Sequence, residues 1–297
     1  MHHELETSTY VHTFGRHPGG LTLHSGDCVT ARTVDSSGRD HEGAQVCRRG
    51  NPLTGPFVVV EARAGDALAV ELEELSVSRS FGLSAGSVLP ELVPAREVHA
   101  VPDFSLVGWQ LEDGYARALD LGLDLAVPIT PMLGCIGVGP RHEQHISSTA
   151  AGPHGGNMDC RHLTAGATVY LPVFVAGAYL CLGDGHAAQG DGELNGSGIE
   201  VPLRVRFRVR VERGLDIGGP RVELGADILT VGAGRPLERA LQHAVSEMLR
   251  WLQRGFGMSA RDAHLVLSLC AELEIASATA ATVVCKIAKQ RLPSRVR

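Results

Sequence analysis

The sequence is nearly without lysine. Lys286 and Lys289, both close to the end of the chain, are its only lysines, so the other basic residues are arginines. A mechanism that needs a lysine base or a Schiff-base lysine in the centre of the chain is therefore disfavoured. The formal net charge is −6. We expect no nucleic-acid partner, because binding of phosphates needs a strongly basic surface.

Long apolar runs are also missing. No stretch approaches the roughly 18 apolar residues of a membrane-spanning helix, and the start MHHELETSTY has neither the basic nor the apolar part of a secretion signal. The seven cysteines are odd in number and lack CxxC spacing, which is typical of reduced thiols rather than of disulfides or a zinc knuckle. These features predict a cytoplasmic protein with no membrane partner.

Aromatic residues are few but glycines are abundant, 36 in all, which suits a β-rich fold with many tight turns. Leu21–Leu23 and 29–34 read as two strands joined by a Gly-Asp turn, and 57–61 and 67–72 repeat that pattern. We therefore expect two N-terminal hairpins. The stretch 81–110 has little periodicity and is expected to be irregular.

The second half carries stronger signals. Residues 128–140 suit a buried, bulged strand, and residues 168–175 a strand in which Pro172 indicates an edge or a bulge. Alternation over 199–211 predicts a strand with valine, leucine and phenylalanine on one face. Its other face carries Arg204, Arg206, Arg208 and Arg210, which we interpret as a solvated or intersubunit face.

Helix is expected only late in the chain. Apolar residues at helical spacing predict a helix over 236–256, with Pro236 at its first position and Gly255 and Gly257 at its end. Ser259 and Asp262 resemble a capping box that opens a second helix reaching about 275, and 282–287 then reads as a strand. The predicted fold is mainly β, a large β-sandwich core with two helices near the C-terminus. We expect a single domain over 1–297, made of N-terminal hairpins (1–80), a motif-bearing β core (120–232) and a helical pair with a final strand (235–297).

The segment 183–200, GDGHAAQGDGELNGSGIE, is the most informative part of the chain. It holds four carboxylates among glycines, and no Lys or Arg occurs from His162 to Leu203. Carboxylates without a basic partner repel one another unless a cation, protonation or water neutralises them. A second cluster, His154, Asn157 and Asp159, lies one strand earlier and can converge with the first. Oxygen ligands together with imidazoles predict a divalent metal site.

Several motifs resemble the acetamidase/formamidase family. They are Gly155-Gly-Asn-Met-Asp159, Leu171-Pro-Val173, the Gly183–Glu193 stretch, Pro131-Met-Leu-Gly134 and Ile136-Gly-Val-Gly-Pro140. Asp35-Ser-Ser-Gly38, Gly55-Pro56 and Gly65-Asp66 are similar to the family's N-terminal half. The resemblance spans roughly 10–290. It implies a β-sandwich, a homo-oligomer, and hydrolysis of short linear amides such as formamide or acetamide to a carboxylate and ammonia.

Amide hydrolysis needs an activated nucleophile, an oxyanion stabiliser and a proton donor to nitrogen. We therefore assign Asp159, Asp184 and His186 as metal ligands and Glu193 as the general base. His154 and Asn157 are expected to orient the substrate, with Glu200 supporting the ligands. Asp191 is interpreted as a turn residue, and Cys135 as an apolar filler. The metal is zinc or calcium, since the oxygen ligands favour calcium or magnesium and water activation favours zinc.

Two alternatives stay open. The acidic loops can instead belong to a non-catalytic β-sandwich binding module that a metal stabilises. The chain can also be a hydrolase of a different, larger amide.

Overall fold

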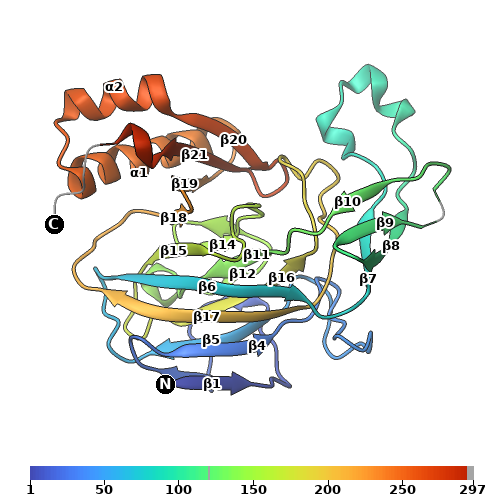
Figure 1. Ribbon diagram of the computed structural model, residues 1–297, viewed down its shortest axis with the longest axis horizontal. Helices are drawn as coiled ribbons and strands as arrows, with labels where there is room; N and C mark the ends of the chain where they lie inside the picture. Colours follow the sequence, from blue (N-terminus) through green and yellow to red (C-terminus); the bar gives the residue numbers. More distant parts are fainter. Residues whose placement is uncertain (120, 293–297) are drawn as a thin grey trace.

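Two β-sheets stacked face to face form the centre of the protein (Figure 1). The computed structural model describes residues 1–119 and 121–292. The nine-stranded sheet has the order β1 (His2–Leu5), β4 (Cys28–Arg32), β17 (Leu203–Glu212), β6 (Ala67–Val77), β15 (Ala167–Pro172), β18 (Arg221–Leu224), β19 (Asp227–Ala233), β21 (Thr282–Ala288) and β20 (Glu272–Ser277). The six-stranded sheet has the order β13 (Ala151–Gly152), β14 (Gly155–Asn157), β11 (Met132–Gly137), β16 (Leu180–His186), β5 (Leu53–Val59) and β3 (Leu21–Leu23).

One hydrophobic core fills the space between these sheets. Phe57 of the six-stranded sheet meets Phe207 of the nine-stranded sheet edge to face, with ring centroids 5.0 Å apart. The alternation of β17 is as expected, because Leu203, Val205 and Val209 are buried as well. The mainly β prediction, a sandwich with two helices near the C-terminus, is confirmed.

The arginines of β17 lie on the outer face and pair with acidic residues of β6. Arg206 Nε lies 2.8 Å from Glu73 Oε2, and Arg210 Nη1 lies 2.7 Å from Glu71 Oε1. The pairing follows from the register, since β17 and β6 are antiparallel neighbours. The positive charges of these arginines are therefore paired with carboxylates of the same chain.

The expected N-terminal hairpins are wrong. Each Gly-Asp turn instead carries the chain from the six-stranded sheet to the nine-stranded sheet, so β3 and β4 do not pair with each other, nor do β5 and β6. The repeat in the sequence is nonetheless structural, because β3 pairs with β5 in parallel while β4 and β6 flank β17. A strand–turn–strand pattern does not reveal whether the second strand stays in the same sheet.

The region expected to be irregular forms part of a third, four-stranded sheet. It contains β7 (Phe81–Ala85) and β8 (Leu106–Glu112), and β9 (Tyr115–Ala118) and β10 (Ala126–Pro128) complete the sheet. Two 3-10 helices, η1 (Pro90–Leu92) and η2 (Ala95–Ala100), lie between β7 and β8 and arch away from the sandwich (Figure 1). Glycines interrupt the alternation of apolar and polar residues in β7 and β8, so the period of two that marks a β-strand is not visible in the sequence.

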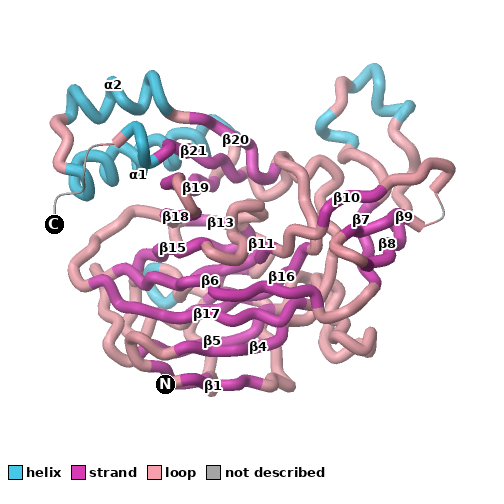
Figure 2. The backbone as a smooth tube through the Cα atoms, viewed as in Figure 1, coloured by secondary structure: helices cyan, strands magenta, loops and turns pink. Residues whose placement is uncertain are grey.

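The helical pair covers one end of the nine-stranded sheet (Figure 2). Helix α1 spans Leu237–Phe256; Pro236 is its N-cap residue rather than its first residue, and Gly257 ends it in a left-handed conformation. Helix α2 spans Ala260–Cys270, and its N-cap Ser259 accepts from the Asp262 amide as predicted. The expected extension to 275 is wrong, because β20 begins at Glu272 and pairs with β21. Residues 293–297 of the expected C-terminal region lie outside the described residues.

Short elements complete the described chain. The strands β2 (Thr13–Phe14) and β12 (Ile146–Ser147) pair with each other, and η3 (Arg141–Glu143) and η4 (Lys289–Arg291) are single 3-10 turns. Pro172 is the last residue of β15, a strand inside the nine-stranded sheet, so the edge interpretation of that proline is wrong. Among the described helices, none combines the length and apolar character that crossing a membrane requires.

The contact between α1 and the sheet gives a first testable prediction. A Cβ placed on Gly232 of β19 would lie 2.0 Å from the Ala240 carbonyl oxygen, so Gly232→Ala has to push the helix away. We expect this substitution to lower the free energy of unfolding by about 1–3 kcal/mol, measured by denaturant titration. Gly219→Ala is the matched control, because its nearest atom would be 4.0 Å away. Equal stability of the two variants would contradict the packing described.

Candidate functional site

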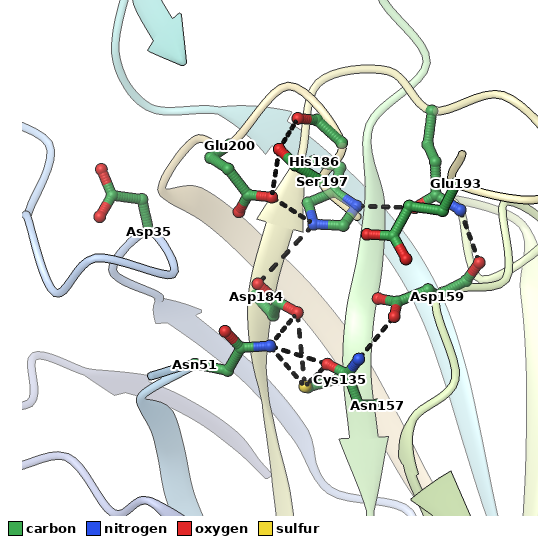
Figure 3. A network of polar contacts seen from close by, with 12 residues as sticks. Asp35, Asn51, Cys135, Asn157, Asp159, Asp184, His186, Glu193, Ser197 and Glu200 are labelled. Carbon is green, nitrogen blue, oxygen red and sulfur yellow. Dashed lines mark hydrogen bonds and ion pairs between the residues drawn. The ribbon is translucent and has the colours of Figure 1, made fainter. Parts of the chain in front are cut away.

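The polar site forms where β16 ends and the following loop begins. Asp184 and His186 belong to β16, and their spacing of two places both side chains toward the same region (Figure 3). Glu193 and Glu200 come from the segment after β16, and Asp159 follows β14. All five side chains are buried or nearly so. The two clusters predicted from the sequence therefore converge.

His186 is at the centre of the site. Its Nε2 atom lies 3.1 Å from Glu200 Oε1 and 3.7 Å from Asp184 Oδ1. Its Nδ1 atom lies 2.8 Å from Gln189 Oε1. Gln189 Nε2 donates a hydrogen bond to the Asp159 carbonyl oxygen at 2.6 Å, and this bond fixes the orientation of the Gln189 amide. Because Gln189 offers His186 an acceptor, Nδ1 carries the proton, and Nε2 is the nitrogen that faces the two carboxylates.

Two carboxylates beside one imidazole favour a positive charge on the ring. Burial opposes the charge, but the Glu200 and Asp184 carboxylates outweigh it and raise the pKa of His186 well above its ordinary value. Burial also raises the pKa of Glu200, and His186 counters this effect. In the absence of another cation, a protonated His186 is thus the only nearby positive charge that the described residues supply.

Asp159 and Glu193 form the other half of the site. Burial, followed by the charges of Glu193 and Asp184, raises the pKa of Asp159 well above its usual range. Glu193 Oε2 accepts hydrogen bonds from Ser277 Oγ at 2.6 Å and from Thr279 Oγ1 at 3.1 Å. These two hydroxyls, from the end of β20 and the turn after it, hold one oxygen of Glu193, and no described hydrogen bond holds the other.

Two amides and a thiol connect the aspartates. Asn51 donates from Nδ2 to Asp184 Oδ2 at 2.7 Å and to Asn157 Oδ1 at 2.8 Å, and Asn157 in turn donates to Asp159. The Cys135 thiol donates to Asn157 Oδ1 at 2.9 Å. Burial and the Asp184 charge raise the pKa of Cys135, which keeps it a thiol rather than a nucleophilic thiolate. Asn157 therefore contacts the site through Asp159, and Cys135 is more than an apolar filler.

Sequence reasoning missed Asn51, Gln189, Ser277 and Thr279. Gln189 lies inside the acidic segment 183–200, so its place in the sequence could have indicated that it belongs to the site. The other three come from segments far away in the sequence and carry no recognisable spacing.

Other expected residues lie apart from the site. His154 is buried edge-on against Phe14, with ring centroids 5.2 Å apart, and burial lowers its pKa to about 4. No described hydrogen bond or ion pair joins His154 to the carboxylates. Asp191 pairs with Arg161 at 2.6 Å on the surface, in keeping with its interpretation as a turn residue.

Three buried carboxylate oxygens have no hydrogen-bond partner among the described residues, namely Asp159 Oδ1, Asp184 Oδ1 and Glu200 Oε2. Two groups of potential ligand atoms lie within 4.8 Å, Asp159–His186–Glu193 and Asp184–His186–Glu200. Buried unsatisfied anionic oxygens are unfavourable, so these residues fit a divalent cation. One imidazole with several carboxylates suits a hard or borderline ion.

The backbone of the site is in an unusual conformation. Asn51, Asp159, Asp184 and Glu193 all have positive φ, between 44° and 55°. Gly134 allows the two aspartates to approach, since a Cβ there would lie 2.7 Å from Asp184 Oδ2 and 2.8 Å from Asp159 Oδ1. Non-glycine residues with positive φ gather at functional sites more often than elsewhere.

The raised pKa of Asp159 gives a second testable prediction. A carboxyl whose folded pKa exceeds its unfolded value stabilises the fold below the unfolded pKa, and this contribution is lost as pH rises through the folded pKa. The raised pKa of His186 acts in the same direction. The chelator-treated protein is thus expected to lose melting temperature as pH rises from about 5 to about 8. Asp159→Asn should raise its melting temperature at the upper pH by at least ~2 °C.

Calorimetry at both pH values measures this difference. Asp191→Asn serves as the control, because Asp191 is at the surface and outside the cluster. The interpretation would be refuted if Asp159→Asn destabilised the chelated protein equally at both pH values.

The part of the chain that carries the site is similar in sequence and in fold to known proteins. A family model described as "Acetamidase/Formamidase family" matches residues 144–289, which include the carboxylates, His186 and Ser277. The crystal structure of a recombinant predicted acetamidase/formamidase from Thermoanaerobacter tengcongensis superposes with a TM-score of 0.86 and is 28% identical, covering 98% of this chain and 96% of that one. An acetamidase structure from Yersinia enterocolitica gives the same TM-score at 27% identity, covering 99% and 94%.

Among curated proteins, one of Schizosaccharomyces pombe, named as a candidate formamidase, is 26% identical over 228 residues. That match covers 60% of this chain but only 55% of the relative, so the chain spans about half the length of that protein. The resemblance seen in the sequence motifs is thus confirmed: the chain is similar to the acetamidase/formamidase family over residues 144–289, and its fold is similar to solved structures of that name over nearly its whole length.

Proposed function

We propose that this protein is an amidohydrolase that cleaves short linear amides to a carboxylate and ammonia, assisted by a divalent cation. The observation that carries the proposal is the group of buried carboxylates around His186, three of whose oxygens lack a hydrogen-bond partner in the described chain. The names of the relatives, formamidase and acetamidase, support the type of bond that is cleaved. Burial of so many acidic groups has no structural benefit by itself.

Asp184, His186 and Glu200 form one potential ligand group and would hold the cation, while Asp159, from the overlapping group with His186 and Glu193, would be a further ligand. A bound divalent ion would lower the pKa of a water and polarise the amide carbonyl. Gln189 sets the tautomer that leaves Nε2 available to a cation. Asn51 holds Asp184 by its second oxygen, so that Oδ1 points toward His186.

Glu193 is the proposed general base. The hydroxyls of Ser277 and Thr279 hold its Oε2, so the carboxylate is oriented before substrate binds. It would accept a proton from the attacking water and then deliver that proton to the amide nitrogen, which leaves as ammonia. Glu193 suits this transfer because it lies at the edge of the buried cluster and also lines the neighbouring cavity.

Ammonia release from formamide, acetamide and propionamide, measured with and without a chelator, tests this proposal. We expect activity that the chelator removes and that added zinc or calcium restores. Protein that loses thermal stability on chelation yet releases no ammonia from any amide would favour the non-catalytic binding module instead.

Glu193→Gln isolates the base. We expect kcat to fall by about 10²–10⁴-fold, with metal content by elemental analysis and melting temperature unchanged. Glu238→Gln is the matched control, since Glu238 is exposed in the first turn of α1 and lies outside the cavity; its activity should stay within about threefold of the parent. An active Glu193→Gln variant would exclude Glu193 as the base.

A further inference from the structure

A cavity of about 860 Å³ lies beside the polar site, between the β7–β10 sheet and the segment that follows β16. Glu193 and Gln189 are both in its wall. Glu193 shares a potential ligand group with Asp159 and His186, and Gln189 contacts the His186 ring. The cavity therefore ends at the residues to which the chemistry has been assigned.

The cavity is large compared with a short amide. Acetamide has four non-hydrogen atoms, and with about 30 Å³ for each water-sized group its volume is on the order of 100 Å³. Cavities of roughly 300–1,000 Å³ typically bury ligands of drug size. A formamide or acetamide molecule would thus leave most of this space to water.

The wall is mainly apolar. Val107 and Trp109 of β8, Val127 of β10, and Leu194 and Ile199 of the acidic segment all line it. The indole Nε1 of Trp109 donates to Ser84 Oγ at 2.9 Å, so the polar end of this side chain is already satisfied and fixed. A ligand consequently meets mainly apolar surface in this cavity.

The charged side chains along the cavity favour an uncharged ligand. Arg161 pairs with Asp191 at 2.6 Å, and His162 pairs with Glu274 at 2.6 Å. Among the described lining residues, Arg161 and His162 are thus each already paired with a carboxylate of the chain, which weakens their attraction for an anionic ligand. Glu193, whose Oε2 accepts two hydrogen bonds, would in addition repel an anion.

We propose that this cavity binds the acyl group of an uncharged, apolar carboxamide, so that the preferred substrates are arylalkyl or branched-alkyl primary amides. Hydrolysis adds water across the C–N bond, giving the apolar carboxylate and ammonia. This inference rests on the proposed amide hydrolysis and specifies its substrate class. Burial of a phenyl-sized group should improve kcat/KM by at least about tenfold over acetamide.

The test compares acetamide, isobutyramide and phenylacetamide by ammonia release and, separately, the binding of phenylacetamide by calorimetry. Val127→Phe fills part of the cavity, and Val88→Phe does the same from the loop after β7, in case the first variant does not fold. Both should lower kcat/KM for phenylacetamide by about tenfold or more relative to kcat/KM for acetamide. Val60→Phe is the control, because Val60 is 54% exposed and outside the cavity.

The outcomes separate this inference from the proposed function. If phenylacetamide binds to the parent but not to Val127→Phe, and neither phenylacetamide nor acetamide is hydrolysed, the ligand class is supported and amide hydrolysis is refuted. Preference for acetamide over phenylacetamide, or an equal loss for both in the cavity variants, would overturn the inference and leave amide hydrolysis intact. Failure of phenylacetamide both to bind and to react would also overturn it.

Discussion

The structure depends on keeping several carboxylates buried around one imidazole. Asp159, Asp184, Glu193 and Glu200 meet at His186, and no described arginine or lysine forms an ion pair with any of them. Their repulsion is strongest in a low-dielectric interior, so the fold has to hold them rigidly. Amide and hydroxyl donors do this, since each carboxylate has one oxygen held by the side chain of Asn51, Asn157, Ser197 or Ser277.

The sandwich explains why these segments meet. β16 lies between β11 and β5 inside the six-stranded sheet, so Asp184 and His186 are on a strand supported on both sides. Glu200 bridges through its backbone to Leu83 of β7 and to His186. The wall of the cavity and the ligand cluster are therefore joined by main-chain hydrogen bonds, which ties the position of the small sheet to the geometry of the site.

Sequence patterns predicted many of the strands and helices, because the spacing of apolar residues depends on which face of each element is buried. The alternation of β17 and the helical spacing of α1 each describe a buried face, and both are present in the structure. The partners of a strand are not a local property, so the Gly-Asp turns were mistaken for hairpins. The end of α2 at Cys270 likewise reflects the pairing of β20 with β21, and nothing within 259–275 reveals that competition.

The same contrast holds for the site. Glycines and unpaired carboxylates within one short segment predicted Asp184, His186, Glu193 and Glu200 as site residues. A second polar cluster, one strand earlier in the chain, predicted Asp159. Asn51 and Ser277 reach the site only through tertiary structure, and an isolated asparagine or serine is ordinary in any loop. His154 is the opposite case: it is adjacent to the motif in sequence, but its ring packs against Phe14, and its role toward substrate stays a prediction.

The left-handed backbone of Asn51, Asp159, Asp184 and Glu193 has a consequence for how this chain can change. Each such residue holds about 1–3 kcal/mol of strain, which glycine would relieve. Selection for backbone stability alone would therefore favour glycine at these four positions and would remove the side chains of the site. At these four positions, backbone stability and the proposed chemistry thus favour different residues.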